Sequence, residues 1–296
     1  MRLALVLVLA TSVAQAEPAP IIGGSATKVG DFPTVVAIEV GQGLCTGTLI
    51  ASDWVMTAAH CLDPQIVGAT DLPSLVKSIR VVFGSVDVHT SSGKAIGASE
   101  VFGDPKFSIT DLGHNDLGLI HLASEYTDVD PTPVNFDATQ APVGVAVTMV
   151  GFGVTQSGAM TQAGVEFTIP AEISEACNKV PSGQGLPILS DANVLCFDQS
   201  TGMGKCEGDS GGPSFAMIGG KQTLIGTTSF GDQDCAMFGV DTRTDAEHEF
   251  VIGHIPDLDG GGCCDAGAAG GPTTGVGVGI VLLGLRIRRR RADKSG

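Results

Sequence analysis

The stretch GKCEGDSGGP, residues 204–213, decides how the rest of the chain is interpreted. It contains Ser210 between glycines at positions 208, 211 and 212. A serine between small residues is commonly part of a turn, but a glycine-rich backbone can also present two amide groups to one oxygen, as an oxyanion site requires. The stretch therefore raises the hypothesis that Ser210 is a catalytic nucleophile, whose partners must lie elsewhere in the chain.

Two further stretches contain the partners that a nucleophilic serine needs, namely a base and a carboxylate that orients the base. WVMTAAHC places His60 directly after an apolar strand, and HNDLGLIHL places Asp116 at the start of another. Asp104 and Asp111 are rival carboxylates, but neither begins an apolar strand. The order His, Asp, Ser indicates a serine hydrolase.

An esterase or lipase is an alternative reading, because residues 208–212 also match the GxSxG elbow of that class. In that class the serine precedes the acid and the histidine, whereas both candidate partners precede Ser210 here. The order of the three residues therefore disfavours this alternative.

Together with IIGG at residues 21–24, these motifs resemble the chymotrypsin-like (trypsin-like) serine proteases over about residues 21–256. The resemblance implies an all-β fold of two six-stranded antiparallel β-barrels with the active site between them, and a short C-terminal helix. It also implies a role for each site residue: His60 is general base and then acid, Asp116 orients it, Ser210 is the nucleophile, and the backbone N–H groups of Gly208 and Ser210 form the oxyanion hole.

The composition independently favours many short strands over long helices. Glycine is abundant at 42 residues, and aromatic residues make up only 5% of the chain. Strands rich in Val, Ile and Thr are predicted over residues 34–40, 46–50, 54–58, 79–83, 117–122, 145–152, 164–169, 224–229 and 239–242. A terminal helix is predicted over residues 245–254.

The amino terminus, MRLALVLVLATSVAQA, has the charged start, apolar run and small-x-small ending of a secretory signal peptide over residues 1–16. Export places the eight cysteines where disulfides persist, so they are expected to be paired or modified rather than metal ligands. The body, residues 21–258, carries 9 Lys or Arg against 28 Asp or Glu and should repel nucleic acid.

The cysteine pairing is open from the sequence alone, and the resemblance supplies it. It implies three disulfides: Cys45–Cys61 under His60, Cys177–Cys196 in the second barrel, and Cys206–Cys235 between the walls of the substrate pocket. Cys263 and Cys264 are left over.

Activation in the resembled family uses a new amino terminus that inserts and pairs with the Asp before the nucleophile. Here these groups would be Ile21 and Asp209. The segment 17–20, Glu-Pro-Ala-Pro, then forms a short propeptide that ends in proline instead of Arg or Lys. Two X-Pro dipeptides suggest removal by an X-Pro-specific dipeptidase, with a less specific protease as the alternative.

The resemblance also assigns the walls of the primary specificity pocket. Gly204, six residues before the nucleophile, stands at the base, where an Asp would select Arg or Lys. Ser229 to Gly231 should pair with the substrate backbone, and Gly231 and Gly239 line the pocket. Trypsin-like specificity is therefore not expected.

Two charged residues leave the specificity open between three alternatives. Lys205 follows the pocket base, and Asp241 stands where the resembled family commonly has Tyr. If they pair, the pocket is nearly neutral and suits apolar residues. An unpaired Lys205 would favour Asp or Glu in the substrate. If Lys205 points to solvent, Asp241 attracts a basic residue.

The carboxy terminus differs from the body in composition. Residues 259–274 form a glycine-rich linker that contains Cys263 and Cys264, and residues 275–296 contain an apolar run followed by an arginine cluster. This arrangement resembles the sorting tails of myxobacterial surface proteins, although the apolar run is shorter than the roughly 20 residues of a membrane span. An ordinary single-span anchor is the alternative.

These observations together predict a secreted serine endopeptidase over residues 21–258, made as a zymogen, that cleaves proteins through an acyl-enzyme. No cofactor and no metal are expected. Its expected partners are protein or peptide substrates and protease inhibitors, with membrane association through the tail before processing, and the protein is expected to be monomeric. A catalytically inactive, protease-like binding protein at the cell surface is the alternative. Such proteins usually have a replaced His, Asp or Ser, and none is replaced here.

Overall fold

The computed structural model describes residues 23–41, 43–90, 92–110, 114–154, 166–175, 177, 189 and 191–260. The predicted signal peptide, the propeptide, Ile21, the rival carboxylate Asp111 and the tail from residue 261 lie outside the described residues. Within the described ranges, no helix combines the length and the apolar character that crossing a bilayer requires.

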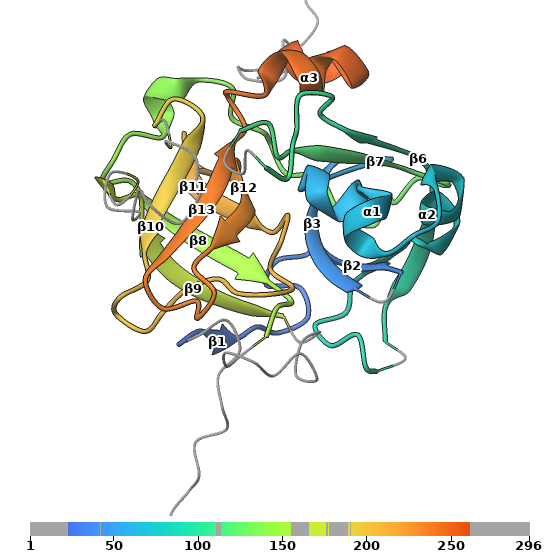
Figure 1. The fold of residues 1–296 in the computed structure, drawn as a ribbon, viewed down its shortest axis with the longest axis horizontal. Helices are drawn as coiled ribbons and strands as arrows, with labels where there is room; N and C mark the ends of the chain where they lie inside the picture. Colours follow the sequence, from blue (N-terminus) through green and yellow to red (C-terminus); the bar gives the residue numbers. More distant parts are fainter. Residues whose placement is uncertain are drawn as a thin grey trace, which may run out of the picture. The chain divides into compact units, whose positions relative to one another are not determined.

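Six antiparallel strands close into a first barrel, coloured blue to green in Figure 1. Around the barrel they follow the order β2 (Val35–Val40), β3 (Gly43–Ala51), β4 (Trp54–Thr57), β7 (Gly118–Leu122), β6 (Lys94–Gly103) and β5 (Arg80–Phe83). This barrel has the strand number and the antiparallel pairing that were expected.

Strand β2 shows why some strands of this barrel are apolar at nearly every position. Alternate side chains of a strand point to opposite sides. Val36 and Ile38 pack inside the barrel, whereas Val35 and Ala37 join a second cluster that contains Phe215 from the other sheet. Both faces of the strand are therefore buried, one in the barrel and one against its neighbour.

The second sheet has seven strands and is only barrel-like. Its order is β1 (Ser25–Ala26), β9 (Phe167–Glu172), β8 (Ala146–Gly151), β11 (Pro213–Ile218), β12 (Lys221–Gly231), β13 (Phe238–Arg243) and β10 (Val194–Asp198). The expected pair of barrel-like sheets is therefore confirmed, the first as a closed barrel and the second as a half-barrel with β1 added at one edge. Strand β10 pairs along one edge with β13, and at its other edge the described residues form one antiparallel bridge, Ser174 to Cys196, just after β9.

Several elements were not predicted from the sequence. Strand β6 buries only Ile96 and Val101 and has an irregular register between residues 98 and 100, so it lacks an apolar pattern. Strands β10 and β11 and the short helices α1 (Pro64–Val67) and α2 (Leu72–Ser78) were also missed. Both helices begin after an Asp whose carboxylate accepts from the backbone N–H of the first turn, a usual N-cap.

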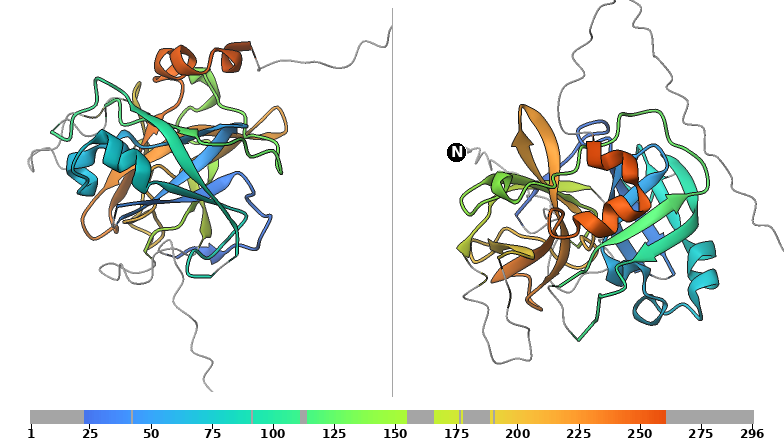
Figure 2. Two further views of the ribbon diagram at one scale, coloured as in Figure 1. Left: turned by 90° about the vertical axis from the view of Figure 1, so that its right-hand side faces the viewer. Right: turned by 90° about the horizontal axis from the view of Figure 1, so that it is seen from above.

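The expected C-terminal helix is present as α3 (His248–His254). Seen from above, it lies over the junction of the two sheets (Figure 2, right). Its Val251 belongs to the same apolar cluster as Leu117 and Phe215. The helix therefore covers the contact between the first barrel and the second sheet.

A buried carboxyl pair anchors the start of this helix. Glu247, at the N-cap of α3, is buried beside the buried Asp104. Burial, followed by the hydrogen bond and the charge of Asp104, raises the pKa of Glu247 from its ordinary 4.5 to about 8. The folded protein therefore favours the protonated form of Glu247.

Stability should consequently fall as the pH rises. A raised carboxyl pKa contributes stability that is complete below pH 4.5 and is lost as the pH passes through about 8. We expect Glu247→Gln to remove this loss, so that the variant exceeds wild type by at least about 1 kcal/mol at pH 9. Urea unfolding at pH 5 and pH 9 measures the free energy of unfolding of both proteins, and Glu249→Gln, at an exposed position, is the control. Equal pH dependence in wild type and Glu247→Gln would contradict this assignment.

Candidate active site

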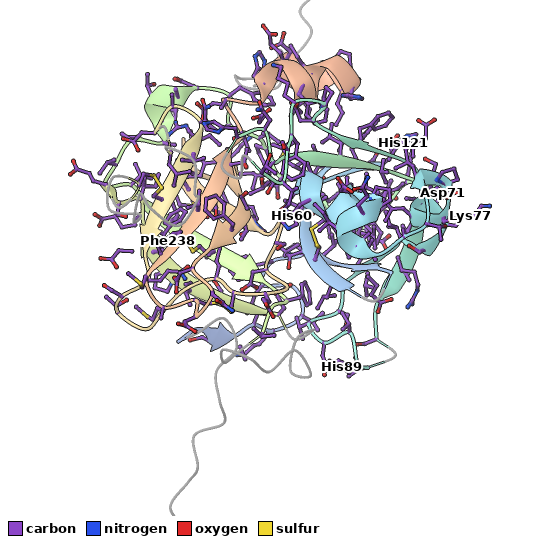
Figure 3. All side chains as sticks on the ribbon, in the orientation of Figure 1. His60, Asp71, Lys77, His89, His121 and Phe238 are labelled. Carbon is purple, nitrogen blue, oxygen red and sulfur yellow. A yellow bond between two sulfur atoms is a disulfide. The ribbon has the colours of Figure 1, made fainter. Side chains whose placement is uncertain are left out.

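His60 lies in a short 3-10 turn, Ala59–Leu62, that follows β4 directly. Figure 3 shows it between the strands of the first barrel and those of the second sheet. A disulfide between Cys45 and Cys61 ties this turn to β3. The His60 side chain is 16% exposed, and its Nδ1 lies 2.8 Å from Oδ2 of Asp116. The backbone N–H of His60 donates to the other oxygen of the same carboxylate at 2.9 Å.

Asp116 is wholly buried immediately before Leu117 and strand β7, and both sheets hold it. Its Oδ2 also accepts from the Ser229 hydroxyl at 2.5 Å, and its carbonyl accepts from the Thr242 hydroxyl. The carboxylate thus accepts from three groups: the backbone N–H of His60, Nδ1 of His60 and the Ser229 hydroxyl. The neutral imidazole of His60 carries its proton on Nδ1, which leaves Nε2 as an acceptor.

The electrostatics of His60 follow from the same contact. Burial lowers its pKa, whereas the charge and the hydrogen bond of Asp116 raise it, and the net result is a pKa above the ordinary 6.5. Asp116 thus stabilises the protonated imidazole. A histidine in this environment can take up a proton and return it.

Ser210 lies in a turn in which the neighbouring positions 208 and 211 have backbone conformations that favour glycine. Gly208 and Gly211 have φ angles of 92° and 76°, and a Cβ on Gly211 would lie 2.6 Å from the Thr46 carbonyl oxygen. The Ser210 carbonyl accepts from the Thr46 N–H, and the Gly211 N–H donates to Thr228. Among the described residues, no backbone carbonyl accepts from the N–H of Gly208 or Ser210.

Short links connect the serine turn to the histidine turn. Thr46, which bonds to Ser210, follows Cys45, and Cys45 is joined to Cys61 beside His60. The Cys61 sulfur lies 3.8 Å from the Ser210 carbonyl oxygen. The backbones that carry Ser210 and His60 therefore meet at one place. The two sulfurs beside His60 are bonded to each other, so they offer no thiolate to a metal.

Asp209 is directed inward, behind the serine turn. Its two carboxylate oxygens accept from the backbone N–H groups of Gly153 and Cys206, each at 2.8 Å. Burial raises its pKa to about 6, against the lowering effect of these two bonds. Its expected partner Ile21 lies outside the described residues.

Lys205 and Asp241 form a buried ion pair. The Lys205 side chain is 3% exposed, its Nζ lies 2.7 and 2.8 Å from the two Asp241 oxygens, and it donates to the Ser214 hydroxyl. Burial lowers the pKa of Lys205, and Asp241 opposes this shift. Of the three arrangements considered from the sequence, the structure has the paired one, so neither charge is directed to solvent.

The other residues that were predicted to line the pocket lie on segments that strand pairing and a disulfide connect. Gly231 pairs with Gly239 across β12 and β13, and the Cys206–Cys235 disulfide joins the segment before Ser210 to the loop between these strands. The third disulfide links Cys177 to Cys196, so all three pairings match those that the resemblance implies.

Sequence reasoning missed Gln199, whose buried side chain lies beside both Gly204 and Gly239. The sequence offered one indication of this residue. Gly204 and Gly239 were both assigned to the pocket walls, and the space that two glycines leave must be filled by another side chain. It also missed Ser214, which completes the hydrogen bonds of Lys205.

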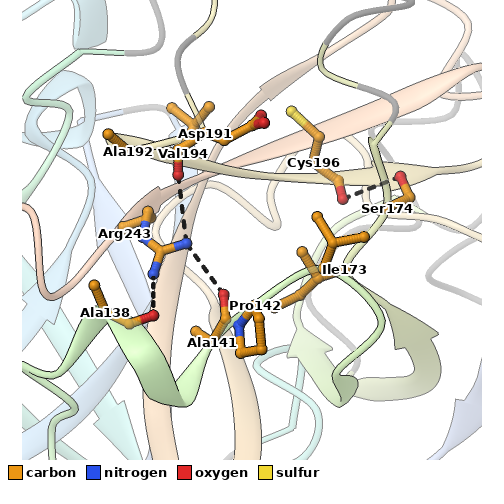
Figure 4. Close-up of a pocket in the computed structure, with 11 residues that line it drawn as sticks. Ala138, Ala141, Pro142, Ile173, Ser174, Asp191, Ala192, Val194, Cys196 and Arg243 are labelled. Carbon is orange, nitrogen blue, oxygen red and sulfur yellow. Dashed lines mark hydrogen bonds between the residues drawn. The ribbon is translucent and has the colours of Figure 1, made fainter.

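A cavity of about 290 Å³ lies apart from these residues, and none of the candidate triad lines it (Figure 4). Arg243 lies at its wall and donates to the carbonyls of Ala138 and Ala141. Its Nε donates to Asp245. These bonds hold the chain before β8 against the end of β13, which is a structural role.

A sequence model of the trypsin family, described as "Trypsin", matches residues 21–248, which is most of the chain. The chain belongs to the trypsin family. The trypsin fold accounts for the closed barrel, the barrel-like second sheet and the C-terminal helix described above.

Relatives of this trypsin-family chain come from several animals. Human "Serine protease 56" is 32% identical over 72% of this chain and 34% of its own length. "Serine protease SP24D" of Anopheles gambiae is 30% identical over 72% of both chains. "Trypsin Blo t 3" of Blomia tropicalis is 28% identical over 71% of this chain and 76% of its own. The match thus spans about a third of the human relative. The three disulfides fit an extracellular member of the family.

Proposed function

We propose that this trypsin-family chain is a secreted serine endopeptidase with His60, Asp116 and Ser210 as its catalytic triad. The observation that carries the proposal is the Nδ1 to Oδ2 contact of His60 with Asp116, next to the linked backbones of Ser210 and His60. The amides of Gly208 and Ser210, which donate to no described backbone carbonyl, are the proposed oxyanion hole.

In the proposed reaction the Ser210 Oγ attacks the scissile carbonyl carbon while Nε2 of His60 takes the hydroxyl proton. The carbonyl oxygen becomes an oxyanion that the two amides bind. Asp116 stabilises the imidazolium through Nδ1. His60 then gives the proton to the leaving amine as the C–N bond breaks, which leaves an acyl-enzyme on Ser210. Water hydrolyses this ester with His60 again as base.

Activation is proposed to follow removal of residues 17–20. The new ammonium of Ile21 would then pair with Asp209, whose buried carboxylate is held by two backbone amides. A cation there would offset the burial that raises the pKa of Asp209. Gly23, two residues on, packs against Met203 of the segment that leads to Ser210. The removal of two X-Pro dipeptides remains our proposal for the processing step.

The pocket beside the triad is proposed to be nearly neutral. Its proposed lining residues are Gly204, Lys205, Ser229, Gly231, Gly239 and Asp241. The charges of Lys205 and Asp241 cancel within a buried pair, so neither attracts a charged substrate side chain strongly. An uncharged residue before the cleaved bond is therefore favoured over Arg or Lys.

Export, zymogen processing and display through the tail complete the proposal. Export is proposed from the signal peptide at residues 1–16. Display is proposed from the linker at 259–274 and the tail at 275–296, with processing near Cys263 and Cys264. The alternative is a non-catalytic, protease-like binding protein. The contact of His60 with a buried Asp116 favours the enzyme, because a binding protein has no need of it.

Labelling with a fluorophosphonate tests the proposal, because this reagent needs an activated serine. We expect stoichiometric labelling of Ser210 in processed wild type and none in His60→Ala. Ser200→Ala, which changes an exposed serine of the same loop, should label normally. The labelled fraction should begin at Ile21 when its amino terminus is sequenced. Correctly processed wild type that stays unlabelled would favour the binding protein.

A further inference from the structure

The space between Gly204 and Gly239 is filled by a side chain from a third segment. A Cβ built on Gly204 would lie 2.1 Å from Cδ of Gln199, and one built on Gly239 would lie 2.4 Å from its Oε1. Gln199 directly follows β10 and is 1% exposed. Its carboxamide therefore occupies the place where side chains at both glycines would begin.

The two glycines around this space lie on segments that lead to Ser210 and pair with β12. Gly204 begins the segment that runs to Ser210, and Gly239 pairs with Gly231 at the end of β12. On the same strand, the Ser229 hydroxyl donates to the catalytic candidate Asp116. A substrate side chain that entered between these walls beside Ser210 would meet Gln199 at the far end.

Hydrogen bonds hold the carboxamide rigidly across the two walls. Its Oε1 accepts from the Lys205 N–H at 2.8 Å. Its Nε2 donates to the carbonyls of Lys205 and Cys235 at 3.2 and 3.3 Å. Both amide protons are thus used, and the carboxamide has no donor left for a ligand. Moving it aside would leave three buried backbone groups without partners.

Among the described residues, the charged side chain next to Gly204 is that of Lys205, and its charge is paired. Its ammonium donates to Asp241 and Ser214. The nearest group to Gly239 is the neutral Oε1 of Gln199. The group that fills the space between Gly204 and Gly239 is therefore an uncharged amide held by hydrogen bonds.

We propose that Gln199 is a specificity-determining residue that forms the floor of the primary pocket and restricts the residue before the cleaved bond to short, uncharged side chains such as Ala or Ser. The inference rests on the proposed endopeptidase function and adds its substrate class. Long apolar and charged side chains are excluded because the carboxamide occupies the depth that they need.

Peptide p-nitroanilides that differ only at the residue before the cleaved bond test the inference. With wild type, kcat/KM for Ala should exceed that for Phe, Leu, Arg or Glu by about 100-fold or more. Enzyme concentrations are set by fluorophosphonate titration, so that rates refer to active sites only.

Two variants separate filled volume from hydrogen bonding. Gln199→Ala and Gln199→Met lose the same three hydrogen bonds, but only Ala empties the space. We expect Gln199→Ala to narrow the preference for Ala over Leu and Phe by about tenfold or more. Gln199→Met, which is close to glutamine in length, should keep the preference near that of wild type.

The outcomes distinguish this inference from the function on which it rests. Wild type that no fluorophosphonate labels overturns both. Wild type that is labelled but cleaves after Phe, Leu or Arg as fast as after Ala overturns the inference alone, even if neither variant folds. An unchanged preference in labelled Gln199→Ala also overturns it.

Discussion

Replacing Asp116 by asparagine is expected to lower kcat about 10⁴-fold without unfolding the protein. The carboxylate accepts from the backbone N–H of His60, from Nδ1 of His60 and from the Ser229 hydroxyl. An asparagine whose oxygen keeps the backbone bond must direct its NH₂ group at Nδ1. The imidazole would then carry its proton on Nε2, and a protonated Nε2 cannot accept the hydroxyl proton of Ser210.

Turnover of a protein substrate per active site, together with the tautomer of His60 from nitrogen NMR shifts, measures this effect. The matched control is Asp104→Asn, which changes the other buried carboxylate considered from the sequence. We expect the control to stay within about tenfold of wild type, because Asp104 contacts Glu247 at the start of α3. A loss in Asp104→Asn as large as that in Asp116→Asn would contradict the proposed triad.

The second large effect concerns stability. Lys205→Ala should lower the free energy of unfolding by about 3 to 5 kcal/mol, because it leaves the wholly buried Asp241 without its cation. The Ser214 hydroxyl would remain as a hydrogen-bond donor to that carboxylate. One neutral donor does not replace an ammonium that contacts both oxygens.

Denaturant unfolding at neutral pH, with the disulfides intact, measures this loss. The double variant Lys205→Met with Asp241→Leu removes both charges and should recover most of the stability, since well-packed apolar residues often replace a buried pair at little cost. Lys221→Ala, at an exposed position of β12, should stay within about 0.5 kcal/mol of wild type. A Lys205→Ala variant as stable as wild type would show that the pair contributes nothing.

Local patterns explain why most of the first barrel could be predicted. Strands β2, β4 and β7 are mostly apolar and bounded by turn residues, because nearly all of their residues are buried. Strand β6 escaped prediction because its exposed face and its irregular register break the pattern. Asp63 and Asp71 are N-cap residues that could have predicted α1 and α2. They were not used, because the composition favoured strands.

The candidate site divides in the same way. The residue types around His60, Asp116 and Ser210 belong to short motifs, so the chemistry is visible wherever the motifs stand in the chain. Lys205 and Asp241 are 36 residues apart, and they pair because the fold buries both side chains in one place. Charge in a sequence does not tell whether a side chain is solvated, and so three specificities remained open.

By itself, the sequence determined the family, the order of the catalytic candidates and the all-β class, because each depends on local motifs or on composition. Only the tertiary structure decided that β1 joins the second sheet, that Lys205 pairs with Asp241 and that Gln199 fills the space between Gly204 and Gly239. These features depend on which segments share one buried volume. Close packing and desolvation act between residues that are distant in the chain, and their effect appears only when the chain is folded.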